Sequence, residues 1–183
     1  RRLLDEDLIG ETELRRLLDE DLIVEYEREL QHCDGRFELR GPEAIHDLLL
    51  RIGDLSAAEL VEPGMTLLLD SSTTVFWLAR RIASVRDLTV VTNSLETAGE
   101  LAALSDARIF LAGGTVNPAY RASFDADAAA YANRFVPDLA FFSIVAVDAA
   151  HGFLDHEPEE AAYARAVLPN ARKAVCLTDA SKF

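Results

Sequence analysis

Short apolar runs alternate with longer amphipathic stretches along most of this chain. Unbroken apolar runs are typical of strands buried on both faces, and apolar positions three or four apart are typical of helices. The runs predict strands over residues 67–69, 88–91, 109–111, 139–147 and 174–177. The amphipathic stretches predict helices over residues 74–82, 95–104, 126–135 and 159–168. This alternation predicts an α/β fold with a mostly parallel sheet that helices cover on both faces, the 139–147 strand lying at its centre.

The amino-terminal part follows a different pattern. Residues 1–9 recur without change at 15–23, and the offset of fourteen is two heptads, so both copies can present one face of a continuous helix. We expect residues 1–41 to form an acidic helical segment with a linker; whether the duplication is natural stays open. Pro42 suits the first turn of a helix, which should continue to about residue 61. Residues 42–183 are expected to form one domain, and we expect the natural chain to continue beyond Phe183.

Charge and composition exclude several classes of partner. The 183 residues carry 32 acidic and 18 basic side chains, and the net charge of −14 opposes the phosphate backbone of nucleic acid. Apolar runs fall well short of the about 20 residues that a membrane span needs. Cys33 and Cys176 match no disulfide or metal spacing, and His151, Asp155 and His156 are interpreted as an ordinary loop. We expect a cytoplasmic protein without metal or cofactor, and no sequence-selective DNA binding by this chain itself.

Small polar residues follow the predicted strands where each strand ends. They are Asp70, Ser71, Ser72, Thr73 and Thr74, then Thr92, Asn93 and Ser94, then Gly113 and Gly114, then Asp148, and finally Asp179 and Lys182. The carboxyl ends of parallel strands share one edge of a sheet, so these residues should line one crevice. Backbone N–H groups, hydroxyls and a lysine suit a phosphate, and aspartates suit sugar hydroxyls. Ser72 or Thr73, and Ser94, also suit a simple helix N-cap, and both roles stay open.

Together these motifs resemble the effector-binding domain of the DeoR family of bacterial transcriptional regulators, from about residue 57 to residue 183. The motifs are Leu69-Asp70-Ser71-Ser72-Thr73-Thr74, Val90-Val91-Thr92-Asn93-Ser94, Leu111-Ala112-Gly113-Gly114, Asp138-Leu139-Ala140-Phe141-Phe142 and Thr178-Asp179-Ala180-Ser181-Lys182-Phe183. The resemblance implies a fold shared with ribose-5-phosphate isomerase and a phosphorylated sugar as effector. The family usually has glycine where Ser72 and Ala146 stand and near Phe124. These changes should narrow the crevice or push a ligand outward, and Asp125 should repel a phosphate.

The resemblance predicts a regulator of sugar metabolism, with repression as the expected mode. Its partners would be a phosphorylated sugar, operator DNA bound through a helix-turn-helix largely absent from this chain, and further copies of the chain in a homodimer or higher homo-oligomer. One alternative is an enzyme of the same fold, a sugar-phosphate isomerase or deaminase. Its base would be Asp70, Asp148 or Asp179, with Lys182 as the stabilising group, although no catalytic set can be assigned. Another is a protein-interaction module that uses the acidic repeat.

Overall fold

The computed structural model describes residues 57–148 and 152–177 of the chain. Their centre is a five-stranded sheet in the order β3-β2-β1-β6-β9, in which every neighbouring pair is parallel. The strands are β1 (Thr66–Leu69), β2 (Thr89–Thr92), β3 (Arg108–Leu111), β6 (Leu139–Ser143) and β9 (Lys173–Leu177). The predicted parallel α/β sheet is therefore confirmed. The acidic segment 1–41 and the helix expected from Pro42 to residue 56 lie outside the described residues.

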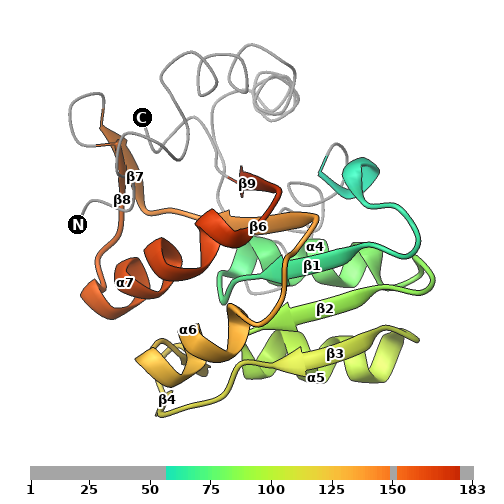
Figure 1. The fold of residues 1–183 in the computed structure, drawn as a ribbon, viewed down its shortest axis with the longest axis horizontal. Helices are drawn as coiled ribbons and strands as arrows, with labels where there is room; N and C mark the ends of the chain where they lie inside the picture. The colour runs from blue at the N-terminus through green and yellow to red at the C-terminus, as the bar shows by residue number, and fades with distance from the viewer. Residues whose placement is uncertain (1–56, 149–151, 178–183) are drawn as a thin grey trace, which may run out of the picture.

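Helices cover both faces of this sheet, as predicted. Figure 1 shows α4 and α5 behind the sheet and α6 and α7 in front of it. Their bounds are α4 (Thr73–Ile82), α5 (Leu95–Leu104), α6 (Ala126–Ala132) and α7 (Pro158–Val167). Ser72, Ser94 and Asp125 begin the first three, each accepting a hydrogen bond from a first-turn N–H. No helix among the described residues is long and apolar enough to cross a membrane.

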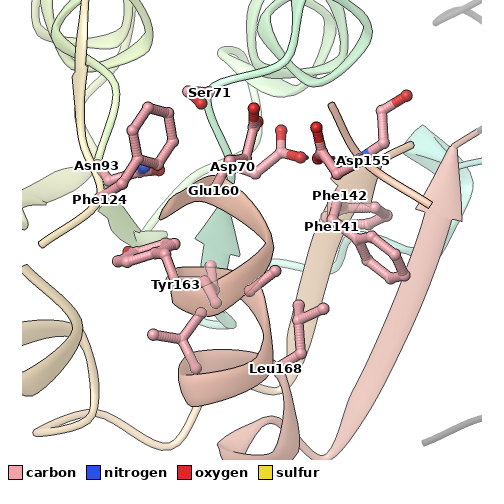
Figure 2. Close-up of a pocket in the computed structure, with 14 residues that line it drawn as sticks. Asp70, Ser71, Asn93, Phe124, Phe141, Phe142, Asp155, Glu160, Tyr163 and Leu168 are labelled. Carbon is pink, nitrogen blue, oxygen red and sulfur yellow. Dashed lines mark hydrogen bonds between the residues drawn. The ribbon is translucent and has the colours of Figure 1, made fainter. Parts of the chain in front are cut away.

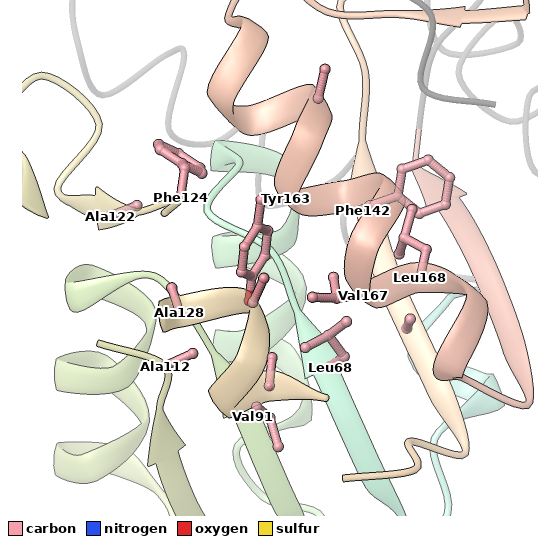
Figure 3. Packing of buried hydrophobic residues seen from close by; sticks show 14 of the residues in the cluster. Leu68, Val91, Ala112, Ala122, Phe124, Ala128, Phe142, Tyr163, Val167 and Leu168 are labelled. Atoms are coloured by element: carbon pink, nitrogen blue, oxygen red, sulfur yellow. The ribbon is translucent and has the colours of Figure 1, made fainter. Parts of the chain in front are cut away.

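Successive side chains of each strand enter two separate cores. Leu67 and Leu69 of β1 pack toward α4, whereas Leu68 between them belongs to the cluster that packs beneath α6 and α7. Figure 3 shows this second cluster, with Tyr163 and Val167 of α7 above Leu68 and Val91. All three β1 leucines are at most 4% exposed. A strand buried on both faces explains why its sequence is an unbroken apolar run.

The prediction of one long strand over residues 139–147 is wrong. The chain leaves the sheet after Ser143, and the next strand, β7 (Ala146–Asp148), pairs antiparallel with β8 (Gly152–Leu154). The reason is that β1 reaches only as far as Leu69, which pairs with Phe141, and the Ser143 N–H donates to the Asp70 side chain instead of a strand. A second hairpin, β4 (Val116–Asn117) and β5 (Ala122–Ser123), was also not predicted.

Several helices begin or end at residues other than those predicted. The helix expected up to residue 61 is, in its described part, a short 3-10 helix, η1 (Ala58–Leu60), before the Pro63-Gly64 turn. Helix α6 ends at Ala132 instead of residue 135, and the Asn133 side chain donates to the Ala166 carbonyl. Helix α7 passes into a second 3-10 helix, η2 (Leu168–Asn170). The helix over 95–104 has the predicted ends.

Candidate functional site

A small cavity lies where the carboxyl ends of β1 and β6 meet. In the sheet, β2 and β3 follow on one side of β1, whereas β6 and β9 follow on the other, so the direction of strand addition reverses at β1. Such a reversal is the topological switch point at which open α/β sheets bind ligands. The volume that a water molecule can reach is about 20 Å³. It is lined by Leu68, Asp70, Ser71, Asn93, Phe124, Phe141, Phe142, Ser143, Asp155, Glu160, Tyr163, Ala164, Val167 and Leu168. Figure 2 shows ten of these residues labelled around the cavity.

Asp70 joins the ends of two strands and the start of a helix. Its Oδ1 accepts hydrogen bonds from the Ser72 N–H at 2.8 Å and from the Ser72 hydroxyl at 2.6 Å. Its Oδ2 accepts from the Ser143 N–H at 2.8 Å. The backbone N–H of Asp70 donates to the Phe141 carbonyl. Asp70 therefore holds β1, α4 and the end of β6 together, a structural role that its position in the sequence did not predict.

Ser72 has two hydrogen-bonding roles of its own. Besides binding Asp70, its hydroxyl accepts from the Val75 N–H at 3.2 Å and so begins α4. The N-cap interpretation of Ser72 is therefore confirmed. The hydroxyl that replaces the family's usual glycine fills one side of Asp70, so it does not point freely into a ligand site. Thr73, the first residue of α4, is exposed.

Two carboxyl groups of the cavity are held far from their ordinary titration range. Burial raises the pKa of Asp70 to about 6, against the three hydrogen bonds, which lower it. Burial raises the pKa of Glu160, in the first turn of α7, to about 8, and the nearby Asp155, Asp70 and Glu157 raise it further. Burial of the two carboxyl groups, together with repulsion from neighbouring carboxylates, therefore raises both pKa values. At neutral pH Asp70 is largely ionised and Glu160 largely protonated.

Three polar atoms of the cavity wall have no hydrogen-bond partner within the described chain. They are the Ser71 hydroxyl, the Asn93 Oδ1 and the Tyr163 hydroxyl. Asn93 is 1% exposed and its amide donates to the Ser123 carbonyl at 3.1 Å, so its free oxygen is held in place. Ser71 lies near Glu160 and lowers the pKa of that carboxyl. Buried polar atoms without partners are uncommon and indicate a place for a ligand or water.

Aromatic rings close the cavity between the β5 end and α7. Phe124 and Tyr163 stack edge to face with ring centroids 6.3 Å apart, and Phe124 meets Tyr120 of the β4–β5 loop at 5.9 Å. Phe124 is 6% exposed. A phenyl ring therefore stands in the segment where the family usually has glycine, and the expected narrowing of the crevice agrees with this placement.

The paired glycines lie beside Asp125 instead of the cavity. The Asp125 carboxylate accepts from the Thr115 N–H at 2.6 Å and from the Ala128 N–H at 2.9 Å. These bonds, that of Thr115 first, lower its pKa. A Cβ on Gly114 would overlap this carboxylate, whereas one on Gly113 would meet nothing. Gly114 therefore makes room for the Asp125 side chain, and neither glycine lines the cavity.

The structure brings together only part of the predicted site. Asp70, Ser71 and Asn93 line the cavity, while Ser94 caps α5 and the Thr92 hydroxyl accepts from the Ser94 N–H. Asp179 and Lys182 lie outside the described residues, as does the side chain of Asp148. Sequence reasoning missed Ser143, Glu160 and Tyr163, and it treated Asp155 only as part of a loop. No local signal marks them: Glu160 looks like an ordinary acidic residue at a helix start.

The family follows from comparison with known proteins. A model described as "DeoR C terminal sensor domain" matches residues 50–183. The chain belongs to this family. The resemblance on which the prediction rested is thereby confirmed, and the motif residues that surround the cavity are those of a sensor domain.

Several of the similar curated proteins are named as repressors. The deoxyribose operon repressor of Escherichia coli (strain K12) is 34% identical over 127 residues, which are 69% of this chain and 50% of that protein. The glycerol-3-phosphate regulon repressor of the same strain is 29% identical, covering 69% and 50%. A putative aga operon transcriptional repressor of Escherichia coli O157:H7 is 27% identical, covering 76% and 52%. The chain spans about half the length of the curated relatives it matches.

A solved structure supports the fold. Ribose 5-phosphate isomerase A from Methanocaldococcus jannaschii superposes with a TM-score of 0.51 at 19% identity, covering 75% of this chain and 54% of that one. The fold that the resemblance implied is therefore present. At this identity the likeness concerns the fold and leaves the chemistry to the site itself.

Proposed function

We propose that residues 42–183 form the effector-binding domain of a transcriptional repressor of sugar metabolism, and that the effector is a phosphorylated sugar. The observation that carries this proposal is the position of the α4 N-terminus beside a cavity at the switch point of the sheet, whose wall contains polar atoms without partners among the described residues. A phosphate suits the first feature and the hydroxyls of a sugar suit the second. The names of the related repressors support the regulatory role.

The phosphate would bind at the first turn of α4. An α-helix leaves its first N–H groups without partners inside the helix. The Ser72 hydroxyl takes that of Val75, which leaves the N–H groups of Thr73 and Thr74 at this end. The nearby Ser71 hydroxyl has no partner among described residues. Lys182, which the sequence places after the last strand, would add a positive charge.

The contacts of Asp70 favour binding over turnover. A general base has to reach the proton that it removes. The Asp70 carboxylate instead accepts three hydrogen bonds from Ser72 and Ser143, so it is committed to the protein. The isomerase or deaminase alternative therefore loses one of its three candidate bases. We attribute operator binding to a helix-turn-helix outside this chain, place the regulator in the cytoplasm with its DNA, and expect a homo-oligomer.

Alanine substitutions test the phosphate site. Thr73→Ala and Lys182→Ala should each weaken binding of a sugar phosphate by about 1–3 kcal/mol, as expected for a charge-assisted contact, measured by calorimetry on the full chain. Thr89→Ala and Lys173→Ala are matched controls, because both residues lie at the amino ends of their strands, at the opposite edge of the sheet. Unchanged affinity in both site variants would overturn the assignment. Conversion of the sugar phosphate during the titration would favour the enzyme instead.

A further inference from the structure

The cavity is lined by carboxyl groups and by no cationic side chain. Its lining residues include three carboxyl groups, from Asp70, Asp155 and Glu160, but no lysine, arginine or histidine. Figure 2 shows these three side chains gathered at one end of the cavity, near Ser71. Glu160 has no ion-pair partner among the described residues. The Ser71 and Tyr163 hydroxyls can donate or accept, so the carboxyl groups decide which charge fits: they favour a cationic group and repel an anion placed among them.

A second observation, independent of the carboxyl groups, points the same way. The Asn93 Oδ1 can only accept, is fully buried, and has no partner within the described chain. The Asn93 amide is turned the other way by its bond to the Ser123 carbonyl, so the side chain cannot flip to present donors instead. The protein therefore holds a buried acceptor in the wall without supplying a donor for it.

The size of the cavity limits what can enter. The reachable volume of about 20 Å³ holds roughly one water molecule. A single ammonium group fits this space, whereas a sugar ring or a phosphate does not. A metal ion is less suitable, because no three acidic, histidine or cysteine side chains of the described chain are close enough to share one.

We propose that the effector is an amino sugar phosphate whose protonated amine enters the cavity between Glu160 and Asn93, while its phosphate stays at the α4 N-terminus. The proposal rests on the function proposed above and specifies its ligand. The ammonium would donate to the Asn93 Oδ1 and to the Glu160 carboxyl group, and its charge would allow Glu160 to ionise. A hydroxyl in the same position would satisfy Asn93 but would leave the like charges uncompensated.

A pair of ligands that differ in one group tests this proposal. The full chain is titrated at pH 7 with glucosamine 6-phosphate and glucose 6-phosphate, and with galactosamine 6-phosphate and galactose 6-phosphate, so that ring stereochemistry does not decide the outcome. In at least one pair the amino compound should bind about tenfold more tightly, as expected for replacing a neutral contact by a charge-assisted one. Glu160→Gln should remove most of that preference. Glu159→Gln, the exposed neighbour on α7, should keep it.

The outcomes separate this proposal from the function on which it rests. If sugar phosphates bind with equal or lower affinity when they carry the amine, the amine site is wrong and the sensor function stands. A preference that Glu160→Gln leaves unchanged would also overturn the amine site. If none of the four compounds binds but another sugar phosphate does, the amine site is wrong and the sensor function stands. If no sugar phosphate binds, the proposed function itself fails, and the amine site with it.

Discussion

The hydrophobic cores on the two faces of the sheet differ in composition, and we call the side beneath α4 and α5 the aliphatic face and the side beneath α6 and α7 the aromatic face. Beneath α4 and α5 the core consists mainly of branched aliphatic side chains, among them Leu67, Leu69, Leu78, Ile82 and Val90. Beneath α6 and α7 it combines alanines with aromatic rings, notably Phe124, Phe142, Phe153 and Tyr163.

This difference places the site. The cavity is lined by Phe124, Phe142 and Tyr163 from the aromatic face, and Asn93 and Asp70 reach it from the ends of β2 and β1. The aliphatic face contributes the helix α4, whose N-terminus is fixed by Ser72, and one residue of its core, Phe141, also lines the cavity. The aliphatic face therefore mainly stabilises the fold, whereas the aromatic face also supplies most of the core residues that line the cavity.

The largest expected effect compares the same substitution on the two faces. Leu78→Ala should lower the free energy of unfolding by about 2–5 kcal/mol, because Leu78 is fully buried in the aliphatic core. Leu168→Ala, beside the cavity, should lie at the lower end of that range, since its side chain already has an empty space on one side. Urea unfolding of both variants measures this. Equal losses would show that the two cores are packed alike.

The next effect depends on pH. Asp70 and Glu160 have folded-state pKa values of about 6 and about 8, above the unfolded values of about 3.9 and about 4.3. At these two sites the folded state therefore binds more protons, so their contribution to stability is fully present below the unfolded values and is lost as pH rises through the folded ones. Between pH 6 and 8 the contribution of Glu160 dominates over that of Asp70, with a slope below the about 1.4 kcal/mol per pH unit that a difference of one whole proton gives.

Variants of α7 assign this slope. Glu160→Gln should remove most of the fall between pH 6 and 8 and reduce the fall between pH 4 and 6 to the part that belongs to Asp70. Glu159→Gln serves as the control, since its side chain is exposed. Unfolding free energies from urea titrations at four or five pH values are sufficient. A slope that persists in Glu160→Gln would mean that another group on the aromatic face titrates there.

The aliphatic face was the easier one to predict from the sequence. The β1 run of three leucines is buried on both faces, and the amphipathic spacing in α4 and α5 is governed by contacts within a few residues. These local signals predicted the strands and helices of this face close to their observed bounds. The hydrogen bonds of Ser72 and Ser94 to the first turns of their helices are local too, and their cap role was foreseen as one alternative.

The aromatic face depends on contacts between distant segments. Ser143 meets Asp70 across 73 positions, and this bond ends β6 where the apolar run continues. Phe124, Glu160 and Tyr163 come together only after β5 and α7 have packed on the sheet. Their residue types are ordinary in a loop or at a helix start. A single sequence therefore could not show which acidic residue of the Glu157–Glu160 run faces the cavity.

A smaller effect tests the role of Ser94 on the aliphatic side. Its hydroxyl accepts from the Thr97 N–H at 3.2 Å and begins α5. Ser94→Ala should cost about 1 kcal/mol of stability, the usual loss of an N-cap, and leave affinity for a sugar phosphate unchanged. Thermal unfolding and calorimetry on the same variant separate the two. A loss of affinity without a loss of stability would return Ser94 to the ligand site, where the sequence pattern had placed it.

The smallest expected effect on stability, and the most informative about the aromatic face, is that of Tyr163→Phe. The Tyr163 side chain is 4% exposed and its hydroxyl has no partner within the described chain. Burial and the nearby Asp70 raise the pKa of this hydroxyl, so it stays protonated at neutral pH. Removing a buried hydroxyl that makes no hydrogen bond should leave stability unchanged or raise it slightly, because its desolvation is not compensated. Urea unfolding beside Tyr131→Phe, a less buried tyrosine of α6, provides the measurement. A loss above about 1 kcal/mol, typical of a broken hydrogen bond, would show that the hydroxyl is satisfied in solution and that the aromatic face is packed as completely as the aliphatic one.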